Sequence, residues 1–206
     1  MNANATPPLV VGVSGASGAM LGVRTLDACR ELGVATHLVV SRGARRTIDA
    51  ELGMSSKEFA AEADVSYPPE DLAAAISSGS FRTLGMVVVP CSMRTLAAIA
   101  TANTTDLLTR AADVCLKERR RLVLVTRETP LNLMHIRNME VVTLAGGVIM
   151  PPVPAFYHQP ATIDDLLAHT AGKVLDQFDI DHRLFRRWEG LTAPQGRYRE
   201  EPGPDA

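Results

Sequence analysis

The feature that most constrains the fold is a short apolar run that ends in a glycine-rich turn and leads directly into a helical pattern. Leu9–Val13 has the length and β-branched content of a buried strand, and Gly12–Gly18 has the spacing G-x-x-G-x-x-G. Residues 19–32 then show helical periodicity up to a stop at Gly33. A strand, a tight turn and a helix in this order begin a β–α–β unit, which requires a parallel sheet with helices packed on it.

The same alternation continues along the chain. Further strands are predicted at Thr36–Val40, Met86–Val89, Leu122–Val125 and Gly147–Met150, and helices at 44–52, 56–63, 93–101, 106–119, 132–144 and 162–178. We therefore expect a single α/β domain over residues 1–191, with a Rossmann-like (flavodoxin-like) open parallel sheet flanked by helices. Residues 192–206 are rich in Pro, Gly and charged residues and are predicted to form a flexible C-terminal tail.

Composition argues against several classes of protein. The formal net charge is -2, so no excess of positive charge favours nucleic acid or an anionic membrane as a partner. No apolar run approaches the ~20 residues of a membrane helix, and the N-terminus lacks the layout of a signal peptide. The three cysteines and five histidines show neither metal-ligand spacing nor a disulfide framework. We expect a cytoplasmic protein without a metal site.

The turn at Gly12–Gly18 is the best physical indication of a ligand. Its small residues let backbone N–H groups approach an anion, and a helix N-terminus adds positive potential. The spacing differs from the dinucleotide pattern G-x-G-x-x-G, and Ser41 and Arg42 stand where a NAD site needs an acidic residue. A mononucleotide such as FMN fits best. Two alternatives stay open. One is NADP, because Arg42 could face a 2′-phosphate, and the other is a tight turn that binds no ligand.

Polar side chains also follow the other predicted strands at their carboxyl ends. Because these ends meet at one edge of a parallel sheet, we expect the side chains to converge on one crevice. Each hydroxyl alone is also a common helix cap. The residues are Ser17, Ser41, Ser92, Thr95 and Arg127.

Candidate chemistry lies in two further places. Glu128 follows a predicted strand, and with Lys117 nearby it could transfer a proton to a leaving phosphate. Tyr157, in a proline-rich loop, could hydrogen-bond an anion while its ring faces an apolar or cationic group. Arg110 shares a helical stripe with Asp113 and Lys117, which a surface ladder of ion pairs also explains.

Taken together, these segments resemble the UbiX-type (Pad-like) flavin prenyltransferases, which belong to the wider flavoprotein (HFCD) superfamily with the FMN-dependent cysteine decarboxylases. The resemblance extends from about Leu9 to Trp188. The matching segments are Val13–Gly18, Ala75–Phe81, Val89–Ser92, Leu107–Val114, Leu116–Arg120, Thr126–Leu131 and Pro154–His158.

The resemblance implies a metal-independent transferase that joins the dimethylallyl group of dimethylallyl phosphate to N5 and C6 of reduced FMN. The prenylated FMN would serve a UbiD-type decarboxylase. It also implies a homododecamer with sites at subunit interfaces.

The resemblance further implies which residues form the site. Positions that match FMN contacts of the family are Gly15, Ala16, Ser17, Ser41, Ser92, Met93, Arg94, Thr95 and Arg127. Positions that match its prenyl-phosphate site are Lys117, Arg127, Glu128, Tyr157 and Lys173. The residues expected to be catalytic are Ser17, Glu51, Arg110, Lys117 and Glu128, with Glu51 and Ser17 near the reacting edge of the flavin.

Two positions depart from the family pattern. Lys173 stands where the family usually has arginine, which keeps the charge but loses the bidentate fork. Thr105-Asp106 replaces a pair that usually reads Asn-Asn, Asp-Asn or Asp-Gly, and Asp106 is either a helix cap or an added negative charge near an anion site.

Two alternative functions remain. One is a non-catalytic accessory subunit of a decarboxylase that binds FMN or prenylated FMN. The other is an FMN-dependent decarboxylase acting on a cysteine-containing peptide or a pantothenoyl compound. The second would use a catalytic histidine after the second strand, where this chain reads Ser41–Arg46 without one.

Overall fold

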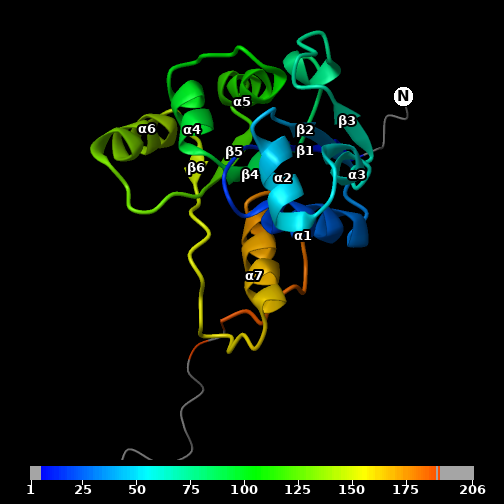
Figure 1. Cartoon of the computed structure of the whole chain (residues 1–206), viewed down its shortest axis with the longest axis vertical. Coiled ribbons are helices and arrows are strands. Elements are labelled where there is room, and N and C mark those ends of the chain that lie inside the picture. Colours follow the sequence, from blue (N-terminus) through cyan, green and yellow to red (C-terminus); the bar gives the residue numbers. More distant parts are fainter. Residues whose placement is uncertain (1–5, 189, 191–206) are drawn as a thin grey trace, which may run out of the picture.

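A parallel six-stranded sheet forms the centre of the molecule, with the strand order β3-β2-β1-β4-β5-β6 (Figure 1). The computed structural model describes residues 6–188 and 190. The strands are β1 (Leu9–Val13), β2 (Thr36–Val40), β3 (Val65–Tyr67), β4 (Gly85–Cys91), β5 (Arg121–Thr126) and β6 (Val148–Ile149). The helices are α1 (Ala19–Glu31), α2 (Ala44–Leu52), α3 (Ser56–Ala60), α4 (Met93–Ala100), α5 (Leu107–Lys117), α6 (Leu133–Leu144) and α7 (Ile163–Asp176), with a 3-10 turn at Ala75–Ser77. The predicted Rossmann-like open sheet is confirmed.

Alternate side chains of each strand enter two separate cores. Leu9, Val11 and Val13 of β1 pack on one face against α1, α2, α3 and α7. Val10 of β1 faces the other side, where α4, α5 and α6 cover the sheet (Figure 1). Burial on both faces explains why the central strands read as continuous apolar runs rather than as alternating patterns.

The strand order reverses at β1. The chain first builds outward through β2 and β3, then returns to place β4 on the other side of β1. The connections after β1 and β4 therefore leave in opposite directions, which opens a crevice at the carboxyl ends of these two strands. This edge of the sheet is where the sequence predicts the site.

Strand β3 is not among the strands that the sequence predicts. Only three residues long, it lies at the edge of the sheet, and Val65 and Ser66 are exposed. An edge strand this short shows no apolar run, so the predicted third strand corresponds to β4. The predicted tail, residues 192–206, lies outside the described residues. In the part of the chain that the structure describes, no helix has the length and apolar character needed to span a membrane.

Candidate functional site

Ser14 joins the loops after β1 and β4. Its Oγ donates to the carbonyl oxygen of Pro90 (3.0 Å) and accepts from the N–H of Ser92 (2.7 Å). The residue is 1% exposed, so these bonds form away from water. A buried hydroxyl with both partners fixes the spacing of the two loops.

Backbone contacts bring the neighbouring loops to the same edge. The N–H of Ser41 donates to the last carbonyl of β1 (2.9 Å), and the N–H of Arg127 donates to the last carbonyl of β4 (3.0 Å). A Cβ on Gly15 would lie 2.9 Å from the carbonyl carbon of Gly43, so the loops after β1 and β2 touch. The loops that carry Ser17, Ser41, Ser92 and Arg127 therefore meet, as the sequence predicts.

The N-terminus of α1 holds a carboxylate of the chain itself. Oε2 of Glu51 accepts from the N–H groups of Gly18 (2.9 Å) and Ala19 (2.8 Å). Partial burial alone would raise the pKa of the Glu51 carboxyl. Hydrogen bonds from the Ser17 side chain and from these two N–H groups, together with the charge of Arg127, outweigh burial and lower that pKa.

This arrangement corrects the interpretation of the first loop. The sequence predicts a phosphate at the helix N-terminus after Gly12–Gly18. In the structure the ionised side chain of Glu51 lies there instead and satisfies two N–H groups of the first turn. Ser17, Glu51 and Arg127 thus lie close together.

The N-terminus of α4 is the better place for a phosphate. Ser92 Oγ accepts from the N–H of Thr95 (3.2 Å) and donates to its hydroxyl (3.1 Å). The first-turn N–H groups of Met93 and Arg94 have no acceptor within residues 6–188 and 190. Two hydroxyls and two N–H groups at a helix N-terminus suit an anion.

A cavity of about 440 Å³ adjoins Ser17 and Glu51. Its other walls are mostly apolar and come from α1, from the segment after β6 and from α7: Met20, Leu21, Pro152, Pro154, Leu166, Leu167 and Thr170, with Gly18 at its edge. An apolar cavity with a few polar groups suits a planar ring system. Because β1 and β4 are neighbours, ring cavity and phosphate site lie side by side, and the residues present fit FMN.

Glu128 lies at the same edge as Arg127. It directly follows Arg127 after β5, is exposed, and its Oε1 accepts from the N–H of Thr129 (3.1 Å). The carboxylate is therefore available at the carboxyl end of the sheet, where the sequence places it.

Arg110 and Asp106 have structural partners on α5. Arg110 donates through Nε to the carbonyl of Ser77 (3.1 Å) and pairs with Asp113 (2.7 Å), so the predicted ion-pair stripe is partly present. Asp106 Oδ1 accepts from the N–H of Thr109 (2.8 Å) in a capping box. The family departure at Asp106 is therefore a helix cap.

Lys117 lies away from Glu128 within one chain. It ends α5, which leads back to the amino end of β5, and it pairs with Glu118 beside Gly79. Glu128 follows the carboxyl end of β5, six residues or ~20 Å further along that strand. The expected proximity of Lys117 and Glu128 is therefore wrong for a single chain.

Tyr157 and Lys173 each have a partner on α7. The Tyr157 hydroxyl lies 3.3 Å from Nε2 of His169, and Nζ of Lys173 lies 3.0 Å from Oδ2 of Asp176. The sequence analysis missed His169 and Asp176. Their spacing with Lys173 along the helix, i, i+4 and i+7, is a signal that could have found them.

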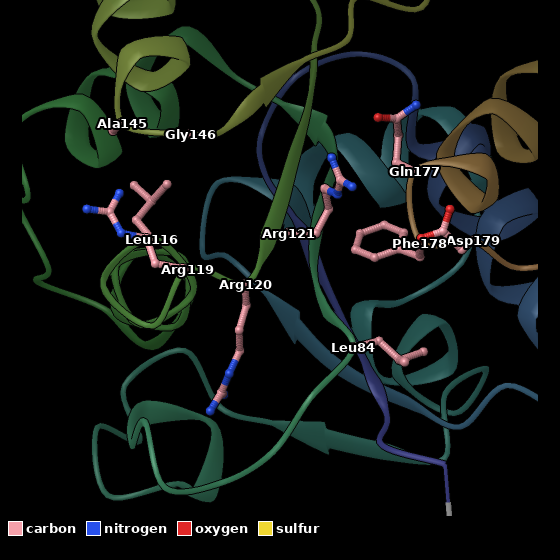
Figure 2. Close-up of a pocket in the computed structure, with 10 residues that line it drawn as sticks. All are labelled: Leu84, Leu116, Arg119, Arg120, Arg121, Ala145, Gly146, Gln177, Phe178 and Asp179. Atoms are coloured by element: carbon pink, nitrogen blue, oxygen red, sulfur yellow. The ribbon is translucent and has the colours of Figure 1, made fainter.

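A second cavity lies at the opposite edge of the sheet (Figure 2). Its volume is about 580 Å³. Arg121, the first residue of β5, lines this cavity, so the cavity lies at the edge where the strands begin. The side chains of Arg119, Arg120 and Arg121 point in different directions in Figure 2. The guanidinium of Arg120 already donates to the carbonyls of Gly79 and Phe81. These arginines do not converge on a ligand.

The described residues contain no cluster of three or more His, Cys, Asp or Glu side chains that could hold a metal ion. Cys29, Cys91 and Cys115 are free and buried. Burial raises the pKa of Cys29 and of Cys115 to about 12, so these thiols stay protonated.

Comparisons with known proteins agree with this geometry. The sequence model of the Flavoprotein family matches residues 2–175. A probable UbiX-like flavin prenyltransferase of Streptomyces sp. (strain D7) is 55% identical over 192 residues, which cover 93% of this chain and 96% of that protein. The flavin prenyltransferase UbiX of Escherichia coli (strain K12) is 55% identical over 185 residues, 88% of this chain and 98% of that protein.

Solved structures show the same relation. The crystal structure of AnUbiX (PadA1) in complex with FMN and dimethylallyl pyrophosphate matches with a TM-score of 0.88 and 53% identity, over 90% of this chain and 99% of that one. A dodecameric FMN-dependent UbiX-like decarboxylase from Escherichia coli O157:H7 matches with a TM-score of 0.86 and 52% identity, over 89% of this chain and 100% of that one. The peptidyl-cysteine decarboxylase EpiD, at 14% identity and a TM-score of 0.60, shares the fold alone.

Proposed function

Because the chain belongs to the Flavoprotein family and, within it, to the UbiX-type flavin prenyltransferases, we propose that it transfers a dimethylallyl group from dimethylallyl phosphate to reduced FMN. The observation that carries the proposal is the crevice at the carboxyl ends of β1 and β4. There an apolar cavity with Ser17 and Glu51 adjoins the anion-binding N-terminus of α4. The product, prenylated FMN, serves a UbiD-type decarboxylase.

FMN binds through two parts of this crevice. Ser41, the run Ser92 to Thr95, and Arg127 hold the phosphate end, while Gly15, Ala16 and Ser17 lie along the ring. Gly15 is needed because any side chain there would meet the backbone of Gly43. When bound and reduced, the flavin supplies the nucleophilic positions N5 and C6.

Glu51 and Ser17 act at the reacting edge of the flavin. The lowered pKa of Glu51 keeps this carboxylate ionised near neutral pH. An ionised carboxylate can accept the proton that C6 loses when its new bond forms. The hydroxyl of Ser17, which bonds to Glu51, lies where it can orient that carboxylate.

Departure of phosphate is assisted by cations and an acid. Arg127, Lys173 and Lys117 stabilise the negative charge that builds on the leaving group, with Arg110 nearby on α5, and Glu128 supplies a proton. Tyr157 and the flavin face provide the electron-rich surroundings that an allyl cation requires.

The site is completed by a neighbouring subunit. Lys117 lies at the opposite edge of its own sheet from Glu128, so one chain alone cannot bring them together. A dodecameric UbiX-like relative supplies a precedent for such an assembly. On α6, Leu133, Ile136 and Leu144 are exposed, at 59%, 51% and 81%, which supports an interface between chains.

The enzyme works in the cytoplasm in this proposal. Its three cysteines are free and buried, as expected of a protein kept in a reducing compartment.

Anaerobic incubation with reduced FMN and dimethylallyl phosphate tests the activity. The expected product, measured by mass spectrometry, is a flavin heavier by one five-carbon prenyl unit, formed together with inorganic phosphate. Recovery of only unmodified FMN from a protein that binds it tightly would contradict the activity and point to a non-catalytic flavin carrier.

A further inference from the structure

Asp176, near the end of α7, holds two cations side by side. Its Oδ2 accepts from Nζ of Lys173 (3.0 Å), and its Oδ1 accepts from the guanidinium of Arg187 (2.7 Å). Burial alone would raise the pKa of the Asp176 carboxyl, but the bonds from Arg187 and Lys173 lower it to about 2. The carboxylate is therefore ionised and fixes the position of both cations.

The third partner of Asp176 is His182. Nδ1 of His182 accepts from the N–H of Leu184 (3.2 Å), so the ring proton is on Nε2, which donates to Asp176 (3.1 Å). A second carboxylate, Asp181, also lies near Arg187. The side chains of Lys173 and Arg187 are 46% and 50% exposed, so both cations are accessible to a ligand.

Aromatic side chains adjoin the paired cations. The ring of Phe185 lies 5.6 Å from the guanidinium carbon of Arg187. Tyr157 stands edge-on to Trp188 at 5.8 Å, and its hydroxyl is positioned by His169 on the same helix as Lys173. The ring centroids of His169 and Phe185 are 4.5 Å apart, so Tyr157, His169, Phe185 and Arg187 form one continuous surface. Exposed cations beside exposed aromatic rings suit a small phosphoester with an unsaturated hydrocarbon group.

We propose that Arg187 is a second phosphate-binding cation of the prenyl-donor site, acting with Lys173, and that Asp176 positions both. This rests on the proposed function, because Tyr157 and Lys173 belong to that site. The ammonium group of Lys173 is a point charge and cannot form two parallel hydrogen bonds to a phosphate. The guanidinium of Arg187 supplies this bidentate contact. The hydrocarbon part of the donor then lies against Tyr157 and Trp188.

The substitution Arg187→Gln tests the proposal, with Arg186→Gln as the matched control. Arg186 is an exposed neighbour on the same segment, and no hydrogen bond of its side chain is found among the described residues. Binding of dimethylallyl phosphate is measured by calorimetry on protein loaded with oxidised FMN, which prevents turnover. We expect Arg187→Gln to weaken this binding about tenfold or more, because the substitution removes a charge-assisted bidentate contact. FMN affinity and the thermal midpoint should stay unchanged.

A second variant separates the contribution of the positive charge of Arg187 from that of its guanidinium geometry. Arg187→Lys should recover part of the binding, because it restores the positive charge without the fork. Wild-type affinity for dimethylallyl phosphate in Arg187→Gln would overturn the proposal, and so would an equal loss in Arg186→Gln. Loss of FMN together with the phosphoester would also overturn it, since it indicates a structural role.

The same experiment distinguishes this inference from the proposed activity. If wild-type protein binds dimethylallyl phosphate through Arg187 but makes no prenylated flavin, the inference holds and the activity fails. If it makes prenylated flavin and Arg187→Gln has an unchanged KM for the donor, the activity holds and the inference fails.

Discussion

A single buried hydroxyl sets the geometry of the crevice. Ser14 donates to the loop after β4 through the carbonyl of Pro90 and accepts from the N–H of Ser92. Ser92 in turn caps α4, whose N-terminus is the proposed phosphate site. The position of the anion site relative to Ser17 therefore depends on Ser14, which has no direct chemical role.

We predict that Ser14→Ala destabilises the protein by about 1–3 kcal/mol, because the buried N–H of Ser92 loses its acceptor. FMN affinity should fall as well, since the first turn of α4 moves. Urea unfolding and FMN titration measure the two effects. Ser66→Ala, an exposed serine on β3, is the control and should stay within about 0.5 kcal/mol of wild type.

The sequence predicts some residues of the site better than others. Ser17, Ser41, Ser92 and Arg127 could be placed together because each follows a strand, and parallel strands end at a common edge. The contact between Glu51 and the N-terminus of α1 joins residues 33 positions apart. It depends on how α2 packs on α1, and local sequence patterns carry no information on that packing.

At the scale of elements, the sequence predicts the buried helices and strands better than the exposed ones. Strands β1 and β2 and helix α2 have the predicted bounds because burial gives them strong periodicity or long apolar runs. Strand β3 was missed because two of its three residues face solvent. The end of α7 was predicted two residues late, since the apolar pattern continues through Phe178 after the helix stops at Asp176.

The start of β4 depends on one glycine. Gly85 has φ +138°, and a Cβ there would lie 2.3 Å from the carbonyl oxygen of Arg121 on the neighbouring β5. The phenyl ring of Phe178 is 2.9 Å away, so neither the backbone nor the ring leaves room. Close approach of β4 and β5 at this point fixes the pairing of Gly85 with Arg121.

Gly85→Ala and Gly33→Ala form a matched pair. Both positions have positive φ, but nothing lies within 4 Å of a Cβ on Gly33. We predict that Gly33→Ala costs about 1 kcal/mol from backbone strain alone. Gly85→Ala should cost about 1–3 kcal/mol more through the clash, measured by the urea midpoint. Equal costs would show that the contact between β4 and β5 is not tight.

At the scale of the whole molecule, the residues of the proposed site lie at two different edges of the sheet. Ser17, Glu51, Arg127 and Glu128 are at the carboxyl edge of the sheet, whereas Lys117 is at the amino edge. The strand predicted at Leu122–Val125, between Lys117 and Glu128, already implies this separation, because a strand rises ~3.3 Å per residue. In the proposed function, an oligomer that places α5 of one subunit near the crevice of another resolves the separation.

Subunit complementation tests this account most directly. Ser17→Ala and Lys117→Met are purified separately, and each alone should make little prenylated FMN. When the two proteins are dissociated, mixed and reassembled, some crevices combine an intact Ser17 with an intact Lys117 from the neighbouring subunit. We predict that anaerobic mass spectrometry then detects prenylated FMN well above either variant alone. If reassembled mixtures stay as inactive as the separate variants while wild-type protein treated in the same way regains activity, the site is not shared between subunits.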